Sequence, residues 1–108
     1  MSNAGWLRLT LTPGIGGETQ RKLLAAFGLP EAIYAAGRLA VRSVAGERAD
    51  LLFDVDADTA VSHGLAWAEQ PNQHILTLAD ADYPQALLEI ADPPTLLYVR
   101  GNPALLQK

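Results

Sequence analysis

Apolar residues recur at helical spacing through residues 1–70, and glycines and prolines divide them into segments. The pattern predicts an opening helix that ends before Pro13, because a proline disfavours helical geometry in the preceding residue. A second helix is predicted from Glu18 to Phe27, with Gly28 ending it. Pro30 then opens a third helix, which Gly37 closes. This half of the chain is therefore predicted to be helical.

The same pattern continues in weaker form from Leu39 to Phe53, with a break at Gly46. We interpret this stretch as a second, degenerate helix-turn-helix unit. A longer helix follows, capped by Asp56 or Asp58 and reaching about Gln70. The apolar spacing predicts that its inward residues are Val61, Leu65 and Ala68.

The pattern changes after Pro71. His74 to Leu78 is predicted to be a strand, and a short helix follows in which Pro84 occupies the first turn. Asp92-Pro93-Pro94 is predicted to stop that helix, Thr95 to Val99 to form a buried strand, and Gly101 to turn the chain.

A strand this apolar usually lies in a sheet covered on both faces. We therefore expect the chain to be the front end of a longer protein, with Asn102 to Lys108 starting another element. The opening Ser2-Asn3-Ala4 resembles a remnant of an expression tag. The predicted fold is mainly α, with a helical domain over residues 1–70 and the first strands and helix of an incomplete α/β domain over 71–108.

Composition narrows the function classes. The chain has 108 residues, a net charge of −4 and no cysteine, which excludes a disulfide framework, a zinc–thiolate site and a thiol nucleophile. No apolar run approaches the ~20 residues that cross a bilayer, so we expect a soluble, cytoplasmic protein without a membrane partner. Residues 1–48 carry a net charge of +3 and residues 49–108 one of −7, so the helical half is the one that could face phosphates.

A glycine turn stands between the first two predicted helices, in the segment Leu11 to Gly17. Its glycines permit turn geometry and leave backbone N–H groups exposed at the start of the next helix, where an anion is favoured. The segment resembles the helix-hairpin-helix motif of non-specific DNA-binding proteins. The resemblance implies a DNA-backbone site made of Gly14, Ile15, Gly16, Arg21 and Lys22. Ile15 is predicted to lie between the two helices, and Lys22 to supply a counter-charge.

The C-terminal motif is more specific. It consists of Tyr83-Pro84, Asp92-Pro93-Pro94, Tyr98 and Gly101 in a fixed register. With the hairpin some sixty residues upstream, it resembles the DNA-processing protein A (DprA/Smf) family. The resemblance implies a SAM-like or helix-hairpin-helix domain, followed by a Rossmann-like domain whose phosphate-binding loop would lie beyond Lys108. It also implies a cytoplasmic protein that binds single-stranded DNA mainly through that missing domain, helps to load the RecA recombinase in natural transformation, and forms a homodimer as the whole protein.

Other constellations have simpler interpretations. Asp54, Asp56 and Asp58 resemble half of a calcium loop, but the expected glycine and glutamate positions are filled by Thr59 and Leu65. Asp80 and Asp82 are predicted to initiate a turn. His63 and His74 lack partners at ligand spacing, and Trp6 and Trp67 are at positions typical of a core. We therefore predict no catalytic residue, no metal and no cofactor.

Three function classes remain open. The leading hypothesis is a non-enzymatic DNA-handling protein in which this segment is an accessory DNA-backbone or docking module. The alternative is a protein–protein interaction module whose degenerate hairpin does not bind DNA. It is favoured by the acidic total charge, and by Glu18 and Gln20 at positions where many such hairpins carry a basic residue and an alanine. An enzyme with a nucleotide-binding Rossmann domain is the third, and no residue of this chain supports it.

Overall fold

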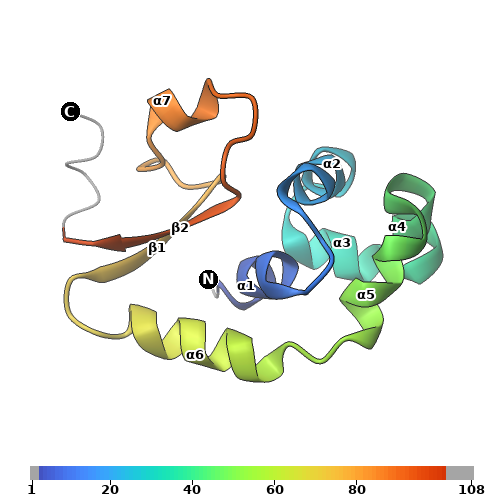
Figure 1. Ribbon diagram of the computed structural model, residues 1–108, viewed down its shortest axis with the longest axis horizontal. Coiled ribbons are helices and arrows are strands. Elements are labelled where there is room, and N and C mark those ends of the chain that lie inside the picture. The colour runs from blue at the N-terminus through green and yellow to red at the C-terminus, as the bar shows by residue number, and fades with distance from the viewer. Residues whose placement is uncertain (1–2, 102–108) are drawn as a thin grey trace.

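The computed structural model describes residues 3–101 and is mainly helical, with one two-stranded sheet (Figure 1), as the sequence predicts. The elements, in chain order, are α1 (Ala4–Leu11), α2 (Gly17–Phe27), α3 (Pro30–Ala36), α4 (Arg38–Ala45), a 3-10 turn (Gly46–Arg48), α5 (Ala49–Asp54), α6 (Asp58–Ala68), β1 (Gln73–Thr77), α7 (Gln85–Leu88) and β2 (Leu96–Arg100). The predicted end of the first helix, both ends of the second and third helices, and the break at Gly46 are confirmed to within about two residues. Asn102 to Lys108, predicted to start a further element, lie outside the described residues.

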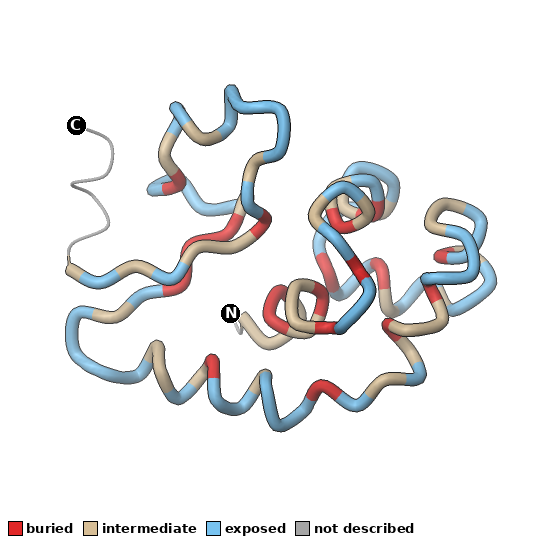
Figure 2. Tube along the Cα trace, viewed as in Figure 1, coloured by how far each residue is buried: buried red, intermediate tan, exposed pale blue. Residues whose placement is uncertain are grey.

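The helices from α1 to α5 enclose one apolar core. Its buried members come from every helix of this group and from the hairpin turn: Leu9, Ile15, Leu23, Ile33, Val41, Ala49 and Leu52. Figure 2 shows these buried stretches facing one another across the helical part, while the outer faces are exposed. Burial of this apolar surface is the main force that holds such short helices together, since none is long enough to be stable alone.

The helix α1 lies at the centre of the molecule (Figure 1) and contacts α2, α3, α6 and β2. Leu7 and Leu9 have no exposed surface, and Trp6 is also buried. Leu9 belongs to the core of the helical group, whereas Leu7 packs against Gly64 of α6. The central helix therefore joins the helical group to α6 and the sheet.

The orientation of α6 differs in one respect from the prediction. Val61, Leu65 and Ala68 are only half-buried, and the buried residue of this helix is Gly64. A Cβ atom at Gly64 would lie 2.9 Å from a methyl carbon of Leu7, so the two helices approach most closely at the position without a side chain. The N-cap residue of α6 is Ala57, so neither Asp56 nor Asp58 takes the predicted capping position. An Asp56 carboxylate oxygen instead accepts a hydrogen bond at 2.9 Å from the backbone N–H of Asp58, the first residue of the helix.

The strands β1 and β2 pair in antiparallel fashion, with Gln73 opposite Arg100 and Thr77 opposite Leu96. The prediction of a fully buried second strand is wrong. Only Thr95, just before β2, is buried, and Tyr98 within the strand is half exposed. The β2 side chains have too few elements packed over them among the described residues to cover both faces of the sheet.

The short helix after Tyr83 also departs from the prediction. Pro84 is extended and precedes α7 instead of occupying its first turn. The helix ends at Leu88, before Asp92-Pro93-Pro94, so the proline pair does not terminate it. One turn of helix has little stability of its own. The segment from Tyr83 to Pro94 is instead closed by a hydrogen bond that the Tyr83 hydroxyl donates to the Pro94 carbonyl at 2.6 Å. The SAM-like and Rossmann-like assignments, and the boundary between residues 70 and 71, stay predictions.

The loop closure by Tyr83 can be tested with a single hydroxyl deletion. Replacing the buried Tyr83 by Phe removes the hydrogen bond to Pro94 and should lower the free energy of unfolding by ~1 kcal/mol. Tyr98→Phe is the matched control, because this side chain is half exposed and the change should lie within ~0.5 kcal/mol of zero. Urea denaturation followed by circular dichroism measures both. Equal effects at the two positions would show that the Tyr83 bond contributes nothing specific.

Gly14 should be the least replaceable glycine of the hairpin. It has a φ of +86°, and an added Cβ would lie 2.6 Å from a methyl carbon of Leu51. We expect Gly14→Ala to cost ~2–4 kcal/mol in unfolding free energy, from backbone strain and the clash together. In a Leu51→Ala background the clash is removed and only the strain remains, so the same glycine substitution should cost ~1–2 kcal/mol. Strictly additive effects in this double-mutant cycle would contradict the proposed contact.

Candidate nucleic-acid interface

A turn joins α1 to α2 where the hairpin is predicted, and Thr12 fixes the first half of this turn. This residue is buried, its hydroxyl donates to the Arg8 carbonyl at 2.6 Å, and its carbonyl accepts from the Ile15 N–H at 3.4 Å. Side-chain oxygens of threonine commonly satisfy the last carbonyls of a helix in this way. The turn is thus held to the end of α1 and is not a free loop.

Ile15 lies in the core between the helices, as predicted. The neighbouring carbonyl group is satisfied by Gln20, which is buried and whose amide nitrogen donates to the Ile15 oxygen at 3.1 Å. The hairpin motif normally carries a small residue at this place, and the glutamine uses the extra volume for a hydrogen bond inside the turn. Gln20 therefore has a packing role that stabilises the hairpin without contributing to a phosphate site.

The two glycines of the turn, Gly14 and Gly16, have different surroundings. Gly16 is exposed, no neighbouring atom lies within 4 Å of its missing Cβ, and it precedes the first residue of α2. Gly14 instead faces the Leu51 side chain, so its missing side chain makes room for packing against α5. Both glycines are exposed, but only at Gly16 is the space around the missing Cβ open.

Arg21, a predicted phosphate ligand, has a partner that the sequence pattern did not predict. Its guanidinium forms an ion pair with the Asp92 carboxylate and donates to the Pro93 carbonyl at 3.1 Å. Asp92 and Pro93 belong to the C-terminal motif, so the hairpin and that motif are in direct contact. An ion pair with an exposed carboxylate is weak and exchangeable, and this one leaves Arg21 close to the surface.

A shallow hollow of about 760 Å³ lies at this contact. Residues from the start of α2, from the 3-10 turn and from the motif line it: Gly16, Gly17, Thr19, Arg21, Arg48 and Asp92, with Glu18. Two arginines are thus balanced by two carboxylates. Lys22 is exposed on the next turn of α2 but does not line the hollow. Arg48 is the residue that the sequence reasoning missed, because nothing in its local spacing relates it to the hairpin.

The remaining motif residues shape the C-terminal part. Tyr98 packs edge to face against Trp67 of α6 at a centroid distance of 5.3 Å. Gly101 has a φ of +98°, and its N–H donates to the Asn72 carbonyl at 2.7 Å. Tyr83 is buried, and burial raises the pKa of its hydroxyl above the ordinary value. Tyr98 therefore links the sheet to α6, whereas Gly101 and Tyr83 hold the turns on either side of the strands.

The acidic clusters have structural partners. Arg42 holds the pKa of Asp50 below its usual range through hydrogen bonds of 2.5 and 3.0 Å, and Arg38 lowers the pKa of Asp54 in the same way. The Asp80 carboxylate accepts from the Thr77 N–H at 2.7 Å, which confirms its turn-forming role.

Within residues 3–101, no three histidine or acidic side chains gather as metal ligands. Trp6 is in the core, as predicted, and Trp67 is half-buried against Tyr98.

None of the described helices combines the length and the apolar character needed to cross a membrane. Neither a curated protein nor a solved structure matches the chain.

One comparison gives a match. Residues 74–108 match the family model described as DNA recombination-mediator protein A. The matched segment starts in β1 and contains the whole motif from Tyr83 to Gly101. The resemblance drawn from that motif is confirmed by this match, and the segment from residue 74 onward is similar to the DNA recombination-mediator protein A family.

Proposed function

We propose that the protein takes part in DNA recombination by binding single-stranded DNA and assisting a RecA-type recombinase, and that the hairpin contributes a weak DNA-backbone contact. The family match carries this proposal, because its description places the family in recombination. The proposed role is one of binding and not of catalysis. In the same proposal, most of the DNA affinity of the whole protein lies outside this chain.

The geometry of the hairpin supports a modest backbone contact. Gly16 is open, Lys22 is exposed, and Arg48 lines the hollow in front of α2. Backbone N–H groups at a helix start and cations on one side of it favour a phosphate. Glu18 and Asp92 lie in the same hollow and oppose a second phosphate, so the contact should be short and sensitive to salt.

A specific observation also favours the alternative of a protein-docking module. Gln20 is turned into the hairpin, and Arg21 is engaged by the motif, so two residues of the DNA-binding pattern serve internal packing. On this alternative the hairpin stabilises the junction with the C-terminal part, and a protein surface takes the place of DNA.

Fluorescence anisotropy of a labelled single-stranded oligonucleotide, titrated with this chain, distinguishes the DNA-backbone contact from the protein-docking module. We expect weak binding that falls with salt, and a loss of several-fold in affinity for Lys22→Gln and for Arg48→Gln. Each lost contact should also reduce the slope of log K against log salt by ~0.7. Arg100→Gln, an exposed arginine at the end of β2, is the matched control and should bind like the original chain. Absence of binding, or equal losses for all three variants, would favour the docking module.

Asp92→Asn tests whether the motif restrains Arg21. The substitution removes the carboxylate charge next to Arg21 and leaves the side-chain size unchanged, so Arg21 becomes available to phosphates. We expect the affinity for single-stranded DNA to rise by ~2–5-fold, in keeping with the low energy of an exposed ion pair. Asp82→Asn, which removes a charge of the same sign from the neighbouring loop, controls for general electrostatics. An identical rise in both variants would show that only net charge matters.

A further inference from the structure

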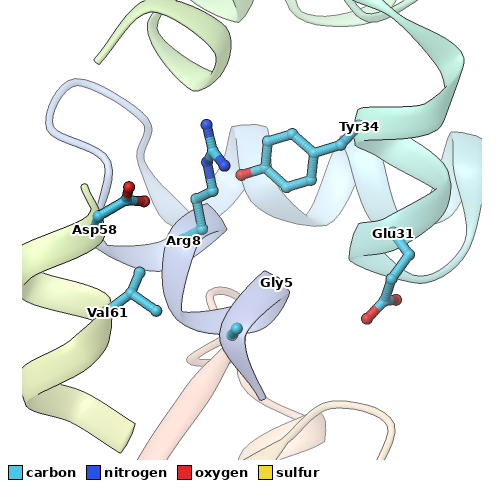
Figure 3. Close-up of a pocket in the computed structure, with 7 residues that line it drawn as sticks. Gly5, Arg8, Glu31, Tyr34, Asp58 and Val61 are labelled. Atoms are coloured by element: carbon cyan, nitrogen blue, oxygen red, sulfur yellow. The ribbon is translucent and has the colours of Figure 1, made fainter. Parts of the chain in front are cut away.

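A separate cavity of about 400 Å³ lies between α1, α3 and α6, away from the hairpin hollow. Its volume is in the range of small-ligand sites. Figure 3 shows the residues around it, which are Gly5, Arg8, Glu31, Tyr34, Asp58 and Val61. None of them belongs to the predicted DNA site or to the C-terminal motif, so the cavity is unrelated to the function proposed above.

The Arg8 guanidinium has no counter-ion among the described residues. It lies over the Tyr34 ring, with its carbon 5.1 Å from the ring centroid, and no hydrogen bond or ion pair holds it. Arg21, Arg38 and Arg42 each pair with a carboxylate. The Arg8 Nε atom is buried without a hydrogen-bond partner, which costs free energy in a charged group. An anionic ligand would supply the acceptor that this buried N–H lacks.

The Tyr34 hydroxyl beside it is also buried without a hydrogen-bond partner. Burial raises the pKa of Tyr34 to about 12, against the opposing effect of the Arg8 charge, so the hydroxyl keeps its proton at neutral pH. The cavity wall thus offers two adjacent donors, Arg8 Nε–H and Tyr34 O–H, that lack an acceptor. Both atoms are buried, so a change of rotamer, which is common on binding, is needed to bring them to a ligand.

We propose that this cavity binds a carboxylate carried on a small apolar group. One carboxylate offers two acceptor oxygens to the two donors and a single negative charge to the single cation. Val61 and the Tyr34 ring supply an apolar wall for the rest of the ligand. Glu31 and Asp58 line the same cavity and oppose any added negative charge, so a doubly charged phosphate or a nucleic acid is disfavoured more strongly than a singly charged carboxylate. The carboxylate comes either from a free organic acid or from an acidic side chain of a peptide.

Nuclear magnetic resonance of the ¹⁵N-labelled chain, titrated with sodium benzoate, tests the site directly. We expect a saturable shift of the Arg8 Nε–H resonance, with binding in the millimolar range or tighter. Arg8→Leu should weaken the affinity at least about tenfold, and Tyr34→Phe should weaken it several-fold while keeping the ring contact. Arg100→Leu, at an exposed arginine at the end of β2, is the control and should leave the affinity unchanged. Backbone amide spectra show whether each variant is folded, and Arg8→Lys replaces Arg8→Leu if the latter is not.

Further probes separate the ligand classes. Benzamide has the shape of benzoate without its charge and should not bind, and inorganic phosphate should bind more weakly than benzoate. A short peptide with blocked ends and adjacent Glu and Phe residues distinguishes the two sources. Tighter binding of the peptide than of benzoate assigns the site to a partner protein, and the reverse assigns it to a free acid. The proposal would be overturned if the Arg8 resonance did not shift. It would also be overturned if benzamide or phosphate bound as tightly as benzoate, or if the Arg8→Leu variant bound benzoate as tightly as the original chain.

Discussion

The burial of α1 on several sides is the constraint on which the rest of the structure depends. Trp6, Leu7 and Leu9 stand within four residues of one another, and helical geometry directs them to different neighbours. Leu9 completes the core of the helical group, and Leu7 meets Gly64 of α6. A helix of eight residues cannot hold its shape in water alone. Because the same helix is shared, the helical group and the α6–sheet region fold as one packed unit.

A second coupling links the hairpin to the family motif. Arg21 of α2 reaches Asp92 and Pro93, and Tyr83 holds the same loop closed at Pro94. The buried tyrosine provides a fixed scaffold, while the ion pair at the surface is weak and can exchange. The residues that mark the family therefore have a structural task here. They also sit where they can compete with a phosphate for the only arginine of the predicted DNA site.

Charge counted along the sequence overstates the charge available for DNA. The helical half carries a net charge of +3, yet Arg21, Arg38 and Arg42 are paired with aspartates from the acidic half. Arg8 lies in a separate cavity against Tyr34. The unpaired cations near the hairpin are then Lys22 and Arg48, within the described residues. This distribution agrees with an accessory DNA contact and argues against a main DNA-binding surface on this part of the chain.

The sequence by itself determined where the first three helices end and the burial of Ile15 in the turn between α1 and α2, because prolines, glycines and apolar spacing act on nearby backbone. It also carries the motif that lies within the match to the family model. Only the tertiary structure decided the burial of Gly64, the partner of Arg21 and the open side of β2. Each of these depends on residues far apart in the chain. The spacing of apolar residues predicts which face of its own helix or strand a residue occupies. The residues that contact this face depend on how the helices and strands pack together.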